Sequence, residues 1–148
     1  MSESRVIRIA AAVIQDDAGR MLVVRKSGTV AFMQPGGKLE PGESAAECLS
    51  RELHEELALV VPVAELEPVG RFRADAANEA GWRVDCDVFR ASTLPLAASA
   101  RGAAGGGIVV QAEIAEARWC TRDELLGLAA DGVLAPLTRD NLDAFLRD

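Results

Sequence analysis

The segment from Ser44 to Leu57 constrains the fold of this chain more than any other, because it reads as one amphipathic helix. Ser44 and Glu47 have the spacing of a capping box, which predicts where the helix begins. Apolar residues recur at intervals of three and four on one face: Ala45, Cys48, Leu49, Leu53 and Leu57. Such a face must be buried against a sheet or another helix, so the sequence requires a core on this side.

The opposite face of this helix carries the side chains of Arg51, Glu52, Glu55 and Glu56. Carboxylates three and four residues apart rise from one stripe, and near the C-terminal end of a helix they also oppose its dipole. A divalent cation such as Mg²⁺, which takes oxygen ligands, would compensate for this repulsion. The alternative is a solvated, glutamate-rich surface on which Arg51 pairs with Glu55.

The residues before the helix are rich in glycine and proline. Proline and paired glycines in the segment 32–37 predict an irregular connection without a continued strand or helix. The segment 36–43 can then fold back over the helix, because glycine allows the backbone to approach a ligand closely. Its carbonyl oxygens could supply a further metal ligand.

Four apolar stretches before and after this helix have the character of strands. The runs 5–14 and 20–25, with turn residues between them, predict a β-hairpin. The stretches 66–74 and 82–91 are expected to pair across a turn at 78–81. The Ala- and Gly-rich segment 92–107 predicts a mobile loop within the domain.

The last third of the chain predicts one strand and two helices. The strand covers 113–120, a second capping box formed by Thr121 and Glu124 begins a helix that ends near Ala130, and a final helix begins at Pro136 or Thr138 and ends near Arg147. We therefore expect one α+β domain over residues 1–148, with a sheet between helices.

Composition narrows the partners and the compartment. The net charge of −7, without a run of Lys or Arg, argues against binding to a nucleic-acid backbone and suits cation binding better. We find no apolar stretch long enough to cross a membrane and no signal-peptide layout, so a cytoplasmic protein without a membrane partner is expected. Three cysteines without a metal-site spacing are expected to be buried thiols.

The loop and helix together resemble the signature of the Nudix (MutT-like) hydrolases, G-x5-E-x7-R-E-U-x-E-E-x-G-U, where U is aliphatic. The matching residues are Gly37, Glu43, Arg51, Glu52, Leu53, Glu55, Glu56 and Leu59. One position departs, because Ala58 stands where the family has its last glycine. That glycine carries no catalytic group, so the departure bears on helix capping more than on activity.

The resemblance implies a Nudix-type α/β/α sandwich with a mixed β-sheet and a Mg²⁺-dependent hydrolase, for which Mn²⁺ can substitute. Glu52, Glu55 and Glu56 would ligate the metal together with the Gly36 carbonyl, and Arg51 with Glu43 would brace the loop against the helix. Among these residues, Glu52 is our candidate for the general base that deprotonates the attacking water. A further acidic ligand often comes from a later loop, and Glu113 is the candidate, with Glu116 as the alternative.

The implied substrate is a nucleoside diphosphate linked to another group, with an oxidised nucleoside triphosphate slightly favoured over a nucleotide sugar. Candidate substrate-binding residues are Gly37 and Lys38 in the loop, Phe32, which could stack on a base, and Asn78 in a turn; Phe32 could equally be a core residue. A homodimer is possible. The alternative function is a non-catalytic Nudix-fold nucleotide sensor, although such proteins usually lose the signature carboxylates, and this chain keeps them.

Overall fold

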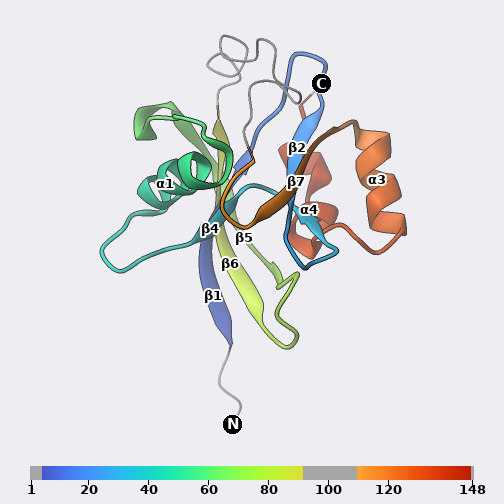
Figure 1. The fold of residues 1–148 in the computed structure, drawn as a ribbon, viewed down its shortest axis with the longest axis horizontal. Helices are drawn as coiled ribbons and strands as arrows, with labels where there is room; N and C mark the ends of the chain where they lie inside the picture. The colour runs from blue at the N-terminus through green and yellow to red at the C-terminus, as the bar shows by residue number, and fades with distance from the viewer. Residues whose placement is uncertain (1–4, 92–109, 148) are drawn as a thin grey trace.

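The computed structural model describes residues 5–91 and 110–147, which form strands and helices in the order shown in Figure 1. The strands are β1 (Val6–Val13), β2 (Met21–Lys26), β3 (Phe32–Met33), β4 (Gly36–Lys38), β5 (Leu66–Asp75), β6 (Arg83–Ala91) and β7 (Ile114–Cys120). The helices are α1 (Ala45–Leu57), the 3-10 helix η1 (Val63–Glu65), α3 (Arg122–Ala130), α4 (Pro136–Asp140) and α5 (Leu142–Phe145). The segment 92–107, for which we predicted a mobile loop, lies outside the described residues.

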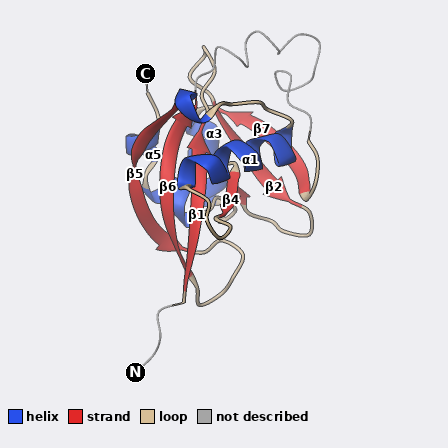
Figure 2. Cartoon of the chain, turned by 90° about the vertical axis from the view of Figure 1, so that its left-hand side faces the viewer, coloured by secondary structure: helices blue, strands red, loops and turns tan. Residues whose placement is uncertain are grey.

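The strands form two sheets, one in the order β4-β1-β6-β5 and one in the order β3-β2-β7. The pair β1 and β6 is parallel and the other pairs are antiparallel, so the larger sheet is mixed. Figures 1 and 2 show α1 packed on one side of the strands, with α3, α4 and α5 on the other side. The predicted α+β fold with a mixed sheet between helices is therefore confirmed.

Residues 10–13 of β1 and 21–24 of β2 are buried on both faces, and their alternation decides which helices each side chain contacts. Ala10 and Ala12 of β1 and Leu22 of β2 belong to the core under α1. The intervening Val13 and Val23 belong to the core under the C-terminal helices. Because side chains alternate along a strand, two short apolar runs bury both layers of helices.

The predicted hairpin of the runs 5–14 and 20–25 is wrong over most of its length. The two strands pair only beside the turn, where the Asp16 amide donates to the Arg20 carbonyl at 2.9 Å and the Leu22 amide donates to the Ile14 carbonyl at 2.9 Å. Beyond that point β1 pairs with β4 and β6, whereas β2 pairs with β3 and β7. Local apolar patterning does not reveal this separation, because long-range partners compete for the same backbone groups.

Two further boundaries differ from expectation. The segment predicted to be irregular contains the short strands β3 and β4, and β4 pairs with β1 through Ala10 and Gly37. The predicted final helix is split into α4 and α5, because Asn141 between them has a φ of −130°. The pairing of β5 with β6, the strand β7 and the capping box of α3 are confirmed.

Candidate active site

Helix α1 begins and ends as its sequence requires. The Ser44 side chain accepts from the Glu47 amide and the Glu47 carboxylate accepts from the Ser44 amide, which completes the predicted capping box. The helix ends at Ala58, which has a φ of 57° in the left-handed region that glycine adopts more easily. Gln111 satisfies two of the last carbonyls of the helix. Its side-chain Nε2 donates to the His54 carbonyl at 2.8 Å, and its backbone N–H donates to the Glu56 carbonyl at 3.0 Å.

Arg51 fastens the preceding loop to α1. Its Nε donates to Glu43 Oε2 at 2.7 Å and its Nη2 donates to Glu43 Oε1 at 2.9 Å, a bidentate pair. Its Nη1 lies 3.1 Å from Glu55 Oε2, and its Nη2 also donates to the Lys38 carbonyl at 3.4 Å. The hydrogen bonds from Arg51 and from the Glu40 amide lower the pKa of Glu43 to about 2. Glu40 and Glu52 also lie within 3.7 Å of Arg51, so four carboxylates surround one guanidinium.

The two glycines of the loop allow it to lie against both the sheet and the helix. A Cβ on Gly36 would collide with the Ala10 carbonyl, and its φ is 153°. A Cβ on Gly37 would collide with the Glu52 carboxylate. Glycine is thus needed here for close approach to the sheet and to α1, in a strand and not in an irregular loop; the predicted approach to a ligand stays a prediction.

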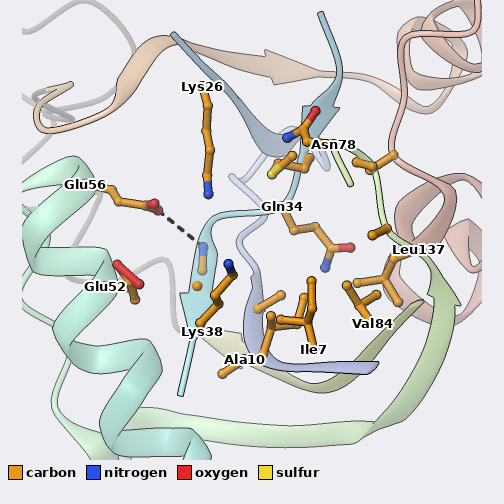
Figure 3. Close-up of a pocket in the computed structure, with 18 of the residues that line it drawn as sticks. Ile7, Ala10, Lys26, Gln34, Lys38, Glu52, Glu56, Asn78, Val84 and Leu137 are labelled. Carbon is orange, nitrogen blue, oxygen red and sulfur yellow. Dashed lines mark hydrogen bonds between the residues drawn. The ribbon is translucent and has the colours of Figure 1, made fainter. Parts of the chain in front are cut away.

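Glu52 and Glu56 are held in an environment that disfavours their negative charge. Glu56 is only 7% exposed, and it accepts one hydrogen bond of 3.3 Å from the Gly36 amide (Figure 3). Burial, followed by the charge of Glu52, raises the pKa of Glu56 to about 7. Burial also raises the pKa of Glu52. Two carboxylates with raised pKa values in one cleft are typical of functional sites.

Of the two candidates for a further acidic ligand, the structure brings Glu113 to this cleft. Glu113 lines the same cavity as Glu52, Glu55 and Glu56. Its position follows from a hydrogen bond of 2.7 Å, in which the Ser27 amide donates to the Glu113 carbonyl. Glu116 instead accepts from Arg25 at 3.3 Å and from Arg118 at 2.9 Å, and it does not line the cavity.

The cavity beside α1 has a volume of about 720 Å³. It extends from the carboxylates of α1 across β4 to Leu137 and Thr138 of α4, and β1, β6 and the turn before β6 close its other sides. Sequence reasoning missed three of its polar residues: Lys26, Gln34 and Thr138. Figure 3 shows the Lys26 side chain reaching from β2 toward Glu56. The one sequence signal for Lys26 is its position at the polar end of an otherwise apolar strand.

The predicted substrate-binding residues divide into two groups. Gly37, Lys38 and Asn78 line the cavity, and Lys38 Nζ lies 4.0 Å from Glu79 Oε2 on the turn that carries Asn78. Phe32 does not line it, because its ring is buried at 5% exposure under the C-terminal helices, with the Arg118 guanidinium 4.5 Å from the ring centroid. The stacking role suggested for Phe32 is therefore wrong, and the alternative of a core residue is confirmed.

The donor atoms of the cleft suit a hard divalent cation. Carboxylate and carbonyl oxygens are the ligands of Mg²⁺, and a buried carboxylate with one long hydrogen bond has lone pairs to spare. Among the residues that the structure describes, no three acidic, histidine or cysteine side chains already converge at metal-binding distance.

Comparison with protein families matches residues 6–140 to the NUDIX domain. The chain belongs to the Nudix family. The matched range contains the loop, helix α1 and Glu113, so the signature and the cavity beside it fall within the family's domain. Nudix hydrolases generally use divalent metals, in agreement with the oxygen-rich cleft.

Solved structures agree with this assignment. The MutT protein from Methanosarcina mazei Go1 has a TM-score of 0.72 and 22% identity, with coverage of 98% of this chain and 96% of that one. The ORF135 protein of E. coli has a TM-score of 0.64 and 25% identity, with coverage of 96% and 89%. Both likenesses extend over nearly the whole chain, so the sandwich described above is the Nudix fold.

Curated relatives match over shorter stretches. An 8-oxo-dGTP diphosphatase of Haemophilus influenzae is 34% identical over 68 residues, which is 43% of this chain and 50% of that protein. An RNA pyrophosphohydrolase of Legionella pneumophila is 43% identical over 47 residues, which is 32% of this chain and 27% of that protein. The chain thus aligns with half or less of the length of these relatives.

No helix in the described part of the chain could span a membrane.

Proposed function

We propose that this chain is a Mg²⁺-dependent hydrolase that cleaves a phosphoanhydride bond in a nucleoside diphosphate linked to another group. The observation that carries the proposal is the pair of carboxylates, Glu52 and Glu56, whose pKa values are raised at one end of a cavity of about 720 Å³. A cavity of this size accommodates a nucleotide. Anionic side chains cannot hold a polyphosphate unaided, so they require a cation between themselves and the substrate.

In this proposal Glu52, Glu55 and Glu56 hold the cation, with the Gly36 carbonyl and Glu113 as further ligands. When bound, Mg²⁺ neutralises phosphate oxygens and lowers the pKa of an attacking water, and Mn²⁺ can replace it. Arg51 acts through Glu43 and the Lys38 carbonyl, because these contacts fix the loop that carries Gly36 and Gly37 against α1.

The reaction consumes one water molecule. The water oxygen forms a bond to one phosphorus, and the bond from that phosphorus to the bridging oxygen breaks. The bridging oxygen leaves on the other phosphorus, so that each of the two products carries a phosphate. The displaced proton passes to a carboxylate of the cleft, and Glu52 is our candidate for it. Burial raises the pKa of this carboxyl, which makes it a better proton acceptor than an exposed glutamate.

The first substrate to test is an oxidised nucleoside triphosphate, because the Haemophilus influenzae relative is an 8-oxo-dGTP diphosphatase. The experiment is a chromatographic screen for the release of cleavage products from normal and oxidised nucleoside triphosphates, ADP-ribose, dinucleoside polyphosphates, nucleotide sugars and 5′-triphosphorylated RNA. The products are pyrophosphate or phosphate from the triphosphates, and a nucleotide with its phosphorylated partner from the other substrates. Each substrate is incubated with Mg²⁺, with Mn²⁺ and with EDTA. We expect metal-dependent release from at least one nucleotide and none with the Glu56→Gln variant. Absence of release from every substrate would contradict the proposal.

A further inference from the structure

Three buried polar residues line the cavity, and two of them do not belong to the carboxylate stripe of α1. The buried polar residues of the described chain are Gln15, Gln34, Glu56, Asp85 and Thr138, of which Gln34, Glu56 and Thr138 line the cavity. Glu56 belongs to the α1 end. Gln34 is 5% exposed and Thr138 is 0% exposed. Burial of polar side chains costs free energy unless their hydrogen bonds are satisfied, so this pair calls for a reason.

The surroundings of Gln34 are apolar. Figure 3 shows its amide pointing away from Glu52 and Glu56 and toward Ile7, Val84 and Leu137, which come from β1, β6 and α4. All three aliphatic side chains line the cavity. These apolar walls thus surround the Gln34 amide, whereas the α1 end offers carboxylates. An apolar chamber with few fixed polar groups is the usual form of a site for a flat heterocycle.

The orientation of the Gln34 amide is fixed by its two partners. Its Nε2 donates to the Ala12 carbonyl at 3.2 Å, and its Oε1 accepts from the Thr138 hydroxyl at 2.9 Å. A carbonyl can only accept, so the nitrogen must lie on the side of Ala12. One N–H of Nε2 and one lone pair of Oε1 remain after these bonds. Adjacent donor and acceptor atoms on an amide match the edge of a nucleobase, as amide side chains do in base recognition.

We infer that Gln34, positioned by the hydroxyl of Thr138, determines which nucleobase the cavity accepts. The inference rests on the proposed function, because that function supplies the nucleotide, with its phosphates at the α1 end and its base beside Gln34. The ligand class is a nucleobase whose edge presents a donor beside an acceptor. Gln34 touches the substrate in this arrangement, whereas Thr138 acts through Gln34 as a positioning residue.

A purely structural tie between the connection before β4 and helix α4 would also explain the Gln34–Thr138 hydrogen bond. The two explanations differ in what they predict for base selectivity. Loss of a purely structural hydrogen bond lowers the melting temperature and weakens the binding of all nucleotides by the same factor. Loss of a base contact changes the ratio of affinities among bases and leaves the sugar and phosphate contribution in place.

The experiment uses isothermal titration calorimetry in the presence of Mg²⁺ to measure the binding of AMP, GMP, CMP, UMP and ribose 5-phosphate. The proteins are wild type, Gln34→Met, Thr138→Val and Thr138→Ser. The matched control is Gln15→Met, because Gln15 is also a buried glutamine (9% exposed) with main-chain partners, yet it does not line the cavity. A melting curve is recorded for each protein.

We expect wild type to bind one of the four nucleotides at least about tenfold more tightly than the weakest, which is the discrimination typical of one amide–base contact. Gln34→Met reduces this ratio to within about threefold and leaves ribose 5-phosphate unchanged within about twofold. Thr138→Val reduces the ratio partly, and Thr138→Ser restores it because the hydroxyl is kept. Gln15→Met retains the wild-type ratio.

Equal binding of all four nucleotides by wild type, or full selectivity in Gln34→Met, would overturn the inference. If Gln34→Met does not fold, the comparison of Thr138→Val with Thr138→Ser decides in the same way. Hydrolysis of every substrate in the screen described above is assayed separately. Selective binding that depends on Gln34 without hydrolysis would refute the proposed function alone, whereas hydrolysis with selectivity independent of Gln34 would refute this inference alone.

Discussion

The surroundings of the Glu56 carboxylate disfavour its negatively charged form. It is buried, its neighbour Glu52 repels it, and the Gly36 amide supplies its one hydrogen bond. Glu55, by contrast, is half exposed and paired with Arg51. The three carboxylates of the stripe therefore differ in burial and in their charged and hydrogen-bonding neighbours, although they are equivalent in the sequence pattern.

Neutralising a metal ligand tests whether the stripe holds a cation or is a solvated face. Glu55→Gln and Glu56→Gln should each lower the hydrolysis rate by at least about 100-fold, because each removes a charged ligand and keeps the shape of the side chain. Glu116→Gln is the control, since Glu116 pairs with Arg25 and Arg118 outside the cavity. Steady-state rates at saturating Mg²⁺ give the answer. Wild-type rates in both α1 variants would leave the stripe as a charged surface.

The raised pKa of Glu56 predicts how the metal-free protein responds to pH. The pKa is about 7 in the folded chain against an ordinary value of 4.5, so the folded state binds more protons between these values. The penalty for burying the charge is thus present above about pH 7 and disappears as pH falls toward 4.5, an effect of roughly 3 kcal/mol at most. The melting temperature in EDTA should accordingly be higher near pH 5.5 than near pH 8.

The Glu56→Gln variant is the control for this pH dependence. It lacks the titrating group, so its melting temperature in EDTA should be higher than that of wild type near pH 8 and should change less toward pH 5.5. The one histidine of the chain is present in both proteins, and its contribution cancels in the comparison. Equal pH slopes in the two proteins would show that Glu56 does not carry the effect.

At the scale of an element, the end of α1 depends on a residue in a conformation that alanine tolerates poorly. Ala58 has a φ of 57°, where a Cβ is unfavourable. Ala58→Gly should therefore stabilise the protein by about 0.5–1 kcal/mol and raise the melting temperature by about 2–4 °C, with a rate within a few-fold of wild type.

The same substitution at Ala46 in the helical part of α1 serves as the matched control. Glycine within a helix costs about 1 kcal/mol relative to alanine, so Ala46→Gly should lower the melting temperature. The two variants thus have opposite expected signs for one chemical change. A fall in both would mean that the left-handed end contributes no strain.

The contact between β4 and α1 gives a second prediction for an element. A Cβ on Gly37 would meet the Glu52 carboxylate, so Gly37→Ala should displace Glu52 and lower the rate by at least about tenfold while the fold persists. Gly127→Ala in α3, where a Cβ would meet nothing within 4 Å, should leave the rate unchanged and match or exceed wild-type stability. Rates and melting curves of both variants check this, and an active Gly37→Ala protein would contradict it.

At the scale of the molecule, the site is assembled from parts that are distant along the chain. Strand β4, helix α1, the segment around Glu113 and the first turn of α4 all line one cavity, and the sandwich of helices on a mixed sheet sets their spacing. A ligand that joins several of these parts stabilises the whole fold, because it binds the folded state and not the unfolded chain.

Metal removal tests this coupling. We expect EDTA to abolish hydrolysis, and Mg²⁺ with a non-hydrolysable nucleotide to raise the melting temperature by several degrees above that in EDTA. The Glu56→Gln variant should lose most of this increase. Hydrolysis that persists in excess EDTA would contradict the metal dependence.

The sequence by itself determined the elements whose information is local. The spacing of apolar residues and the capping boxes gave α1 and α3 their boundaries, and the fixed register of Arg51, Glu52, Glu55 and Glu56 identified the stripe. Helical periodicity and capping act between residues three or four apart, so a single segment contains everything needed to recognise them.

Only the tertiary structure decided which strands pair and which distant residues join the cavity. Strand β2, predicted to pair with the run before it, pairs with β7 over most of its length. Phe32 lies in the core, and Gln34 is hydrogen-bonded to Thr138, which is 104 positions away in the chain. The sequence favoured Glu113 over Glu116, and the structure separates them, because Glu116 is paired with Arg25 and Arg118 whereas Glu113 lines the cavity. Pairings of this kind depend on which of many possible partners gains most from burial and hydrogen bonding, and that competition is settled by the whole chain.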